Sequence, residues 1–206
     1  KLFEFGNSYA KTLSGYEEYK HLAVFITGNA HGTNWNVETK PVDFFLLKGH
    51  IDAVLERLGI KSLNTKPNES AVFSEGISYY LGDRKIVSFG SIKKSILKHF
   101  DIKQEVLFAD FNWNNILNVV SSKIKFAEIP KYPTVKRDLA LLLKEDVSFA
   151  DVYRTVKLVD KNLIKDVSLF DVYQGDKLPE GTKSYAISMK IQDKDKTLTD
   201  AQIDKI

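Results

Sequence analysis

The sequence contains no cysteine, which excludes disulfide bridges and a thiol nucleophile and is compatible with a reducing compartment. It also lacks any run of about 18 apolar residues, so no membrane-spanning helix is expected. Neither sign of charge is in large excess, because 30 basic and 27 acidic residues give a formal net charge of +3. Charge alone therefore does not indicate nucleic acid as a partner, and any RNA contact has to be local.

Residues with catalytic or metal-binding chemistry are sparse in the first part of the chain. No two of the four histidines have the spacing of metal ligands, so no metal site is expected. The segment from Gly28 to Gly32 is followed by neither a lysine nor a helix, so it is not a phosphate loop. Trp35 and Trp113 are interpreted as core or interface aromatics. We find no pairing of acid, base and nucleophile here and expect no catalytic site. The histidines are His21, His31, His50 and His99.

The length of 206 residues suits one or two domains, and 43% apolar residues are enough to build cores. Pro130 and Pro133 stiffen a short segment and indicate a domain boundary. We therefore expect domains at residues 1–122 and 123–206. Lys1 is not a natural start and already reads as strand, so the chain is expected to be a piece of a longer protein.

The first domain reads as strands with helices between them. The first strand is expected to stop at Gly6, and a helix with Asp43 in its first turn is expected to end at Gly59. Ser91 is a candidate N-cap for a later helix. This pattern favours an α+β fold, with helices packed against an antiparallel sheet. Strands are predicted at 2–5, 21–28, 72–73, 77–81, 86–89 and 105–110, and helices at 42–58, 91–100 and 112–121.

The second domain is predicted to run strand, helix, strand, strand, helix. Ser148 and Asp151 form a capping-box-like start, and Thr199 and Gln202 form a second one. This order fits the ferredoxin-like split βαβ plan, also α+β, in which one further strand is expected to follow. The strands are predicted at 135–143, 166–173 and 183–192, and Leu198 and Ile203 occupy hydrophobic-staple positions.

The last of these strands alternates with a period of two, which indicates one buried face and one uncovered face. The uncovered face carries small residues. Asp171 and Tyr173 are two residues apart in the preceding strand, so their side chains point to the same face. The register of the hairpin decides whether this is the uncovered face. The buried set is Tyr185, Ile187, Met189 and Ile191, and the uncovered set is Ser184, Ala186, Ser188 and Lys190.

An aromatic side chain beside small polar residues on an open sheet face can stack an unpaired RNA base, worth roughly 1–3 kcal/mol. The alternative is an ordinary solvated sheet face. Strict alternation along this strand would place Val167 and Leu169, which are apolar, on the same face as Asp171. That face cannot be both buried and open, so the simple alternation conflicts with the composition of the strand. A bend or a bulge in this strand would resolve the conflict.

Two sets of ordered sequence blocks, one in each domain, carry a family resemblance. The blocks of the second domain are Tyr132–Ala140, Leu169–Gly175, Lys183–Ala186 and Thr197–Asp200. Those of the first domain are Leu2–Gly6, Trp35, Val42–Gly49 and Phe89–Ile92. The four blocks of the second domain resemble the C-terminal anticodon-binding domain of the bacterial phenylalanyl-tRNA synthetase β subunit. The first domain resembles the class II catalytic-like module that precedes it in that subunit.

The resemblance implies a cytoplasmic α2β2 enzyme that charges tRNA-Phe with phenylalanine, using ATP and magnesium. Its active site lies in the α subunit. The first domain then has a class II synthetase fold without catalytic residues, and packs on the α subunit. The chain itself is expected to hold no cofactor, and neither a membrane nor DNA is expected as a partner.

The resemblance also implies a tRNA anticodon site on the open face of the second domain. Tyr173 would stack on an anticodon base, and Asp171 and Ser184 would hydrogen-bond it, beside Ala186. Arg137 is a candidate phosphate contact, with pairing to an acidic neighbour as the alternative.

The sequence departs from the family pattern at Lys66–Ser70 and at Ile92–Lys94, so no role is carried over to these loops. Besides the tRNA ligase subunit, two other readings stand. One is a ferredoxin-like single-stranded nucleic-acid-binding module unrelated to aminoacylation. The other is a regulatory module that binds a small molecule, since a fold does not fix a function.

Overall fold

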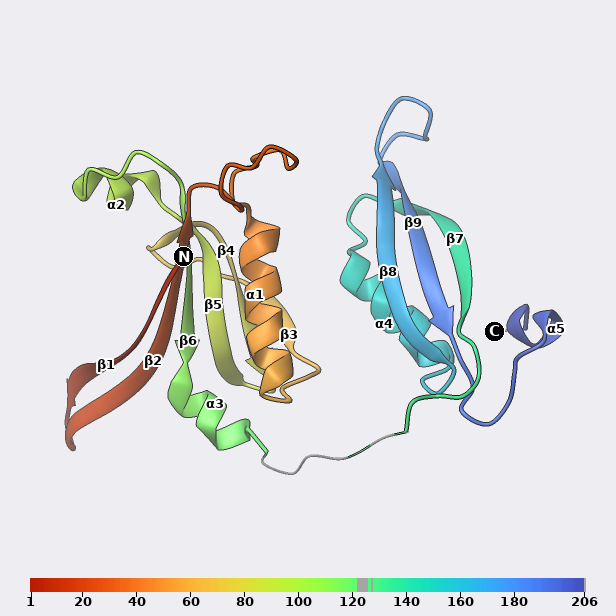
Figure 1. Ribbon diagram of the computed structural model, residues 1–206, viewed down its shortest axis with the longest axis horizontal. Helices are drawn as coiled ribbons and strands as arrows, with labels where there is room; N and C mark the ends of the chain where they lie inside the picture. The colour runs from red at the N-terminus through yellow and green to blue at the C-terminus, as the bar shows by residue number, and fades with distance from the viewer. Residues whose placement is uncertain (122–125, 127, 206) are drawn as a thin grey trace. The chain divides into compact units, whose positions relative to one another are not determined.

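The computed structural model describes residues 1–121, 126 and 128–205 (Figure 1). The chain divides into two compact units, Lys1–Ile124 and Lys125–Ile206. Each unit has an antiparallel sheet with helices and its own buried core, which confirms the predicted α+β fold class.

The first unit is built on a six-stranded antiparallel sheet with the strand order β1-β2-β6-β5-β4-β3. Its strands are β1 (Leu2–Thr12), β2 (Gly15–Thr27), β3 (Asn64–Pro67), β4 (Phe73–Leu81), β5 (Arg84–Ile92) and β6 (Val106–Asn112). Its helices are α1 (Phe44–Arg57), α2 (Lys94–His99) and α3 (Trp113–Val119).

Helix α1 forms where the apolar residues recur every three or four positions, and this stripe is buried against the sheet. Leu47, Ile51 and Leu55 are the buried residues of the stripe. Asp43 is the N-cap rather than a first-turn residue, because its carboxylate accepts a hydrogen bond from the Leu46 N–H at 2.7 Å. Gly59 follows the helix with φ of 72°, which confirms the predicted stop.

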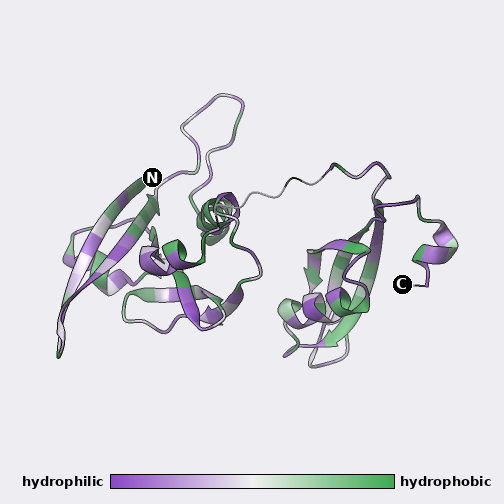
Figure 2. Ribbon diagram, turned by 90° about the horizontal axis from the view of Figure 1, so that it is seen from below, coloured by the Kyte–Doolittle hydropathy of each residue, from purple (hydrophilic) through white to green (hydrophobic). Residues whose placement is uncertain are grey.

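The hairpin of β1 and β2 is much longer than predicted. The first strand was predicted to stop at Gly6, but its pairing with β2 continues to the pair Thr12–Gly15. Strand β2 pairs with β6 only from His21 onward, so the remainder of the hairpin projects beyond the sheet (Figure 1). Nearly all of its residues are exposed on both faces, and hydrophilic and hydrophobic residues are mixed along it without a regular period (Figure 2). Without a buried face, this part of the hairpin has no alternating pattern to reveal it.

Two further predictions in the first unit need correction. Ser91 is not an N-cap: it lies in β5, and its hydroxyl donates to the Glu105 carboxylate at 2.8 Å. Helix α2 begins three residues later, after Lys93, which makes no side-chain cap. Strand β3 was missed because its four residues are all exposed and pair only with β4.

The second unit follows the predicted order of elements on a three-stranded antiparallel sheet, β7-β9-β8. Both capping boxes are present: Ser148 and Asp151 bond reciprocally, and the Thr199 N–H donates to Gln202 Oε1 at 3.1 Å. Its elements are β7 (Val135–Lys144), α4 (Phe149–Val159), β8 (Ile164–Tyr173), β9 (Thr182–Ile191) and α5 (Asp200–Ile203).

Helix α4 covers one face of this sheet. Val152 and Phe149 from the helix pack with Val167, Tyr185 and Ile187 from the strands. The staple residues Leu198 and Ile203 are buried with Ile191 in a second small cluster, as their positions predict. The opposite face of the sheet is left uncovered by α4.

Candidate nucleic-acid interface

A bulge in β8 resolves the parity conflict in that strand. Leu169 lies opposite Ile187 on the buried face, whereas Asp171 lies opposite Ala186, with a register shift between the two pairs. Phe170 is the extra residue. One inserted residue moves every later side chain to the other face, so Leu169 and Asp171 point to opposite faces despite their shared parity.

The register brings four of the five predicted site residues together on the open face. Asp171 pairs with Ala186, and Tyr173 pairs with Ser184, and directly paired residues share a face. Asp171 and Tyr173 are exposed, and Ser184 and Ala186 are half-buried. The face therefore offers an aromatic ring, a carboxylate and a hydroxyl around the small alanine side chain, which lets a flat group approach the backbone.

The Tyr173 ring lies against Gly175. A Cβ added at Gly175 would lie 2.8 Å from the Tyr173 hydroxyl oxygen and 3.1 Å from Cζ, so the outer end of the ring lies against this glycine. The loop after β8 is thus built to leave space for the ring. Any larger residue at this position would displace the tyrosine.

Arg137 is not part of this group. It lies opposite Met189, whose side chain belongs to the buried face, and its guanidinium donates to Asp200 at 2.5 Å. Of the two alternatives for Arg137, the structure therefore has the pairing with an acidic neighbour. The reason is local. Alternation along β7 turns the Arg137 side chain to the covered face, and the first residue of α5, Asp200, places a carboxylate beside it.

Charged residues line the end of the open face away from Tyr173. The Lys190 ammonium forms an ion pair with the Asp166 carboxylate at 3.2 Å, and the Lys136 ammonium lies 3.7 Å from the Asp138 carboxylate. The Lys136 ammonium also lies 5.9 Å from the centre of the Phe170 ring. Neither Phe170 nor Lys136 is among the predicted site residues, although the bulge expected in this strand is a signal that could have drawn attention to Phe170.

The first unit contains a hydrogen-bonded chain of serine, histidine and aspartate, contrary to the expectation that no such groups are paired there. Ser8 Oγ lies 2.8 Å from His21 Nε2, and His21 Nδ1 lies 2.9 Å from Asp110 Oδ1. Acyl transfer also needs donors aimed at an oxyanion, and the neighbouring Tyr19 hydroxyl is already bonded to Glu17. We interpret the chain as a structural tie across three adjacent strands, β1, β2 and β6.

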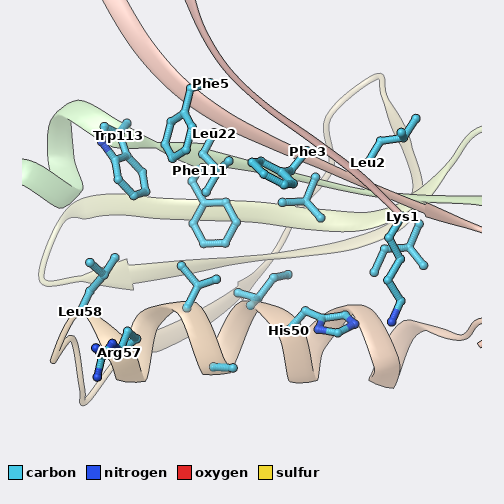
Figure 3. A pocket seen from close by; sticks show the side chains of 15 residues that line it. Lys1, Leu2, Phe3, Phe5, Leu22, His50, Arg57, Leu58, Phe111 and Trp113 are labelled. Atoms are coloured by element: carbon cyan, nitrogen blue, oxygen red, sulfur yellow. The ribbon is translucent and has the colours of Figure 1, made fainter.

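An apolar cleft of about 590 Å³ lies between helix α1 and the base of the hairpin (Figure 3). Phe5, Phe111 and Trp113 face the helix across it, and Phe5 meets Trp113 edge-on with ring centres 4.9 Å apart. The ionisable side chains that line the cleft are all basic. Such a surface suits an apolar partner, and it lacks the carboxylates of an acid–base site.

Two further features of the described residues bear on other functions. No group of three or more histidine, cysteine, aspartate or glutamate side chains is arranged to hold a metal ion in the part of the chain that the structure describes. None of the described helices is long and apolar enough to cross a membrane.

Comparison with known families covers nearly the whole chain. Residues 1–113 match the family described as phenylalanyl tRNA synthetase beta chain CLM domain, and residues 130–206 match the ferredoxin-fold anticodon binding domain. The crystal structure of pyrrolysyl-tRNA synthetase from Desulfitobacterium hafniense is similar over 57% of this chain and 40% of its own, with a TM-score of 0.41 and 18% identity. That likeness is too distant to bear on function.

Curated relatives carry the name phenylalanine–tRNA ligase beta subunit. The protein of Bacteroides thetaiotaomicron is 39% identical over the whole chain, that of Porphyromonas gingivalis 34% over the whole chain, and that of Geobacillus kaustophilus 34% over 98% of it. The chain spans 27%, 27% and 26% of these relatives, or about a quarter of their length. The chain therefore belongs to the phenylalanyl-tRNA synthetase beta chain family, with that family's CLM domain followed by a ferredoxin-fold anticodon-binding domain.

Proposed function

We propose that the chain works as the tRNA-binding part of the β subunit of a phenylalanine–tRNA ligase, and that the open face of its second unit binds the anticodon of tRNA-Phe. The observation that carries this proposal is the register between β8 and β9, which groups Asp171, Tyr173, Ser184 and Ala186 on one uncovered face. The family description of residues 130–206 as an anticodon binding domain supports it and favours it over an unrelated nucleic-acid-binding or regulatory module.

Each residue of this face has a role in the proposal. The Tyr173 ring stacks on an unpaired base, and the Asp171 carboxylate accepts hydrogen bonds from the base edge. The Ser184 hydroxyl both donates and accepts, and Ala186 leaves room for the base plane to approach. Stacking supplies affinity for any base, whereas the polar groups select among bases.

Catalysis belongs to another part of the enzyme in this proposal. The whole ligase is a cytoplasmic α2β2 tetramer that uses ATP and magnesium at an active site in the α subunit. The first unit supports that subunit and holds no cofactor of its own. The name of the curated relatives, which designates one subunit of a larger assembly, supports this division of roles.

Replacing Tyr173 with alanine is expected to weaken binding of a tRNA-Phe anticodon hairpin by about 5- to 150-fold, the loss of one stacked base. Asp171→Ala is expected to reduce the preference for the correct anticodon. In the assembled ligase, both changes should slow charging of tRNA-Phe and leave phenylalanine activation by ATP unchanged. Binding is measured by fluorescence anisotropy, and charging and activation by their separate assays.

Tyr153 is a matched control, because it and Tyr173 are both 41% exposed, but Tyr153 lies on α4. Tyr153→Ala should bind the hairpin normally. Normal charging and normal anticodon preference in the Asp171 and Tyr173 variants would show that this face does not read RNA. Lost activation in a normally assembled enzyme would contradict the proposed division between the subunits.

The first unit is proposed to dock on the α subunit with Trp35 as a principal contact. The Trp35 side chain is 95% exposed, and tryptophan is among the residues that contribute most at protein interfaces. The exposed Phe45 and the apolar cleft beside α1 give the same unit further apolar surface. A partner subunit that covers these side chains would remove them from water.

Trp35→Ala is therefore expected to weaken assembly with the α subunit by about 2 kcal/mol or more, a loss of about 30-fold, without changing the stability of the free chain. Assembly is measured by titrating α subunit against the β variant in analytical ultracentrifugation. Phe100→Ala, at a side chain that is 68% exposed beyond α2, is the control. Equal assembly by both variants would place the α contact elsewhere.

A further inference from the structure

Phe170 occupies a position that the anticodon site does not use. It is the extra residue of the bulge in β8, and its side chain is 59% exposed. The position of Lys136 identifies the face on which the ring lies. Lys136 is directly opposite Lys190 in the pairing of β7 with β9, and the side chain of Lys190 lies on the same face of β9 as those of Ala186 and Ser184. The Lys136 ammonium is 5.9 Å from the Phe170 ring centre, so the ring also lies on the open face.

Ser188 supplies a second, independent observation on the same face. Its side chain is only 4% exposed, and within the described residues its hydroxyl oxygen has no hydrogen-bond partner. The Ser168 hydroxyl bonds to the Ser188 carbonyl instead, at 3.4 Å. Buried hydroxyl groups are nearly always paired, so a group without a partner in the centre of a binding face indicates that a ligand supplies one.

We propose that Phe170, Ser188 and Lys136 form a second nucleotide-binding position on the open face, which takes a nucleotide neighbouring the one stacked on Tyr173. The inference rests on the proposed anticodon function. The Phe170 ring stacks the base, the Ser188 hydroxyl bonds to its edge, and the Lys136 ammonium contacts the phosphate. Lys136 is free to turn to a phosphate, because it is largely exposed and its ion pair with Asp138 is long.

The spacing of the two rings suits a single strand drawn across the sheet. Phe170 and Tyr173 are three residues apart, or about 10 Å along an extended strand. Open sheets that carry aromatic side chains are known to stack two or three unpaired bases. Because every base has a flat face, this second position adds affinity with little base preference, whereas Asp171 and Ser184 discriminate between bases.

The test measures binding of the whole chain to an RNA hairpin with the anticodon loop of tRNA-Phe, by fluorescence anisotropy. Phe170→Ala is expected to weaken binding by about 5- to 150-fold. The same hairpin is then prepared with one loop nucleotide at a time made abasic. The effect of Phe170→Ala should vanish with one abasic position, and that of Tyr173→Ala with a different one.

Two variants and a folding measurement complete the design. Ser188→Ala removes the unpaired hydroxyl without adding volume, and should weaken binding several-fold while the chain remains as stable or becomes more stable. Phe170→Leu keeps an apolar side chain and removes the aromatic face, so it should behave as Phe170→Ala in RNA binding. Circular dichroism establishes that each variant is folded at the assay temperature.

The outcomes separate the two proposals. If Tyr173→Ala weakens binding and Phe170→Ala does not, the second position is overturned and the anticodon site stands. If Phe170→Ala weakens binding by the same factor for every abasic hairpin, Phe170 is a packing residue and the second position is overturned. If the chain does not bind the hairpin, or neither variant changes binding, the anticodon site itself fails and the second position fails with it.

Discussion

Replacing Gly90 with alanine is expected to unfold the first unit or to leave it marginally stable. Gly90 is buried in β5 opposite Gly76 of β4, next to an irregularity in the pairing of the two strands. An alanine Cβ at this position would lie 2.1 Å from the Glu75 carbonyl oxygen and 2.6 Å from the Gly76 Cα. Both are backbone atoms and cannot turn away, so the strands would have to separate.

The expected loss is about 3 kcal/mol or more, at the upper end of what overpacking costs, because relief breaks the β4–β5 ladder. Tryptophan fluorescence during urea unfolding measures this loss in the first unit alone. The only tryptophans of the chain, Trp35 and Trp113, both lie in residues 1–124. Trp113 is the sensitive probe, because it packs against Phe5, whereas Trp35 is in water.

Gly6→Ala is the matched control for this substitution. Gly6 also lies inside a strand, but a Cβ at Gly6 would meet no atom within 4 Å. Alanine should therefore be neutral or slightly stabilising there, by up to about 1 kcal/mol, through the reduced entropy of the unfolded chain. Equal unfolding midpoints for Gly90→Ala and Gly6→Ala would show that β4 and β5 do not approach as closely as described.

The close approach at Gly90 illustrates what the sequence could not reveal. Helix α1 and the capping boxes were predictable because their signals are local: a stripe of period 3.6, or two polar residues three positions apart. The space available to Gly90 is set by Glu75, fifteen residues away, on the neighbouring strand. The projecting hairpin was unpredictable for a different reason, since a strand exposed on both faces leaves no hydrophobic alternation.

The candidate site was predictable to the extent that it depends on strand parity. The conflict between Leu169 and Asp171 already pointed to a bulge, and with that bulge the grouping of Asp171 and Tyr173 with Ser184 follows. Arg137 shows that a matching motif does not by itself place a side chain in the site. The sequence around Arg137 resembles the family, but alternation along β7 turns the Arg137 side chain to the covered face. The chain from Ser8 through His21 to Asp110 joins residues about a hundred positions apart, and only the tertiary structure brings them together.

Replacing Ile187 with alanine is expected to destabilise the second unit by about 2–5 kcal/mol. Ile187 is fully buried in the central strand β9, between Leu139 of β7 and Leu169 of β8, and packs in the core beneath α4. The surrounding strands hold their positions by backbone pairing, so the deleted side chain leaves a cavity that cannot fully close. Ile187→Val removes a single methylene group and should cost only about 0.5–1.5 kcal/mol.

The measurement uses the absence of tryptophan from the second unit. Circular dichroism during urea unfolding should show a transition at lower urea in Ile187→Ala, while the tryptophan signal of the first unit is unchanged. An unaltered circular dichroism transition would mean that Ile187 is not a core residue.

Ile187→Ala also separates stability from recognition. Ala186 and Ser188 flank Ile187 in β9, but their side chains belong to the open face, so the substitution leaves the RNA-binding groups in place. Molecules that remain folded should therefore bind the anticodon hairpin with unchanged affinity, measured well below the unfolding temperature. Tyr173→Ala should do the reverse, because its side chain is exposed and contributes little to the core. If folded Ile187→Ala lost affinity, the covered face would have to take part in RNA binding, and the assignment of recognition to the open face would be wrong.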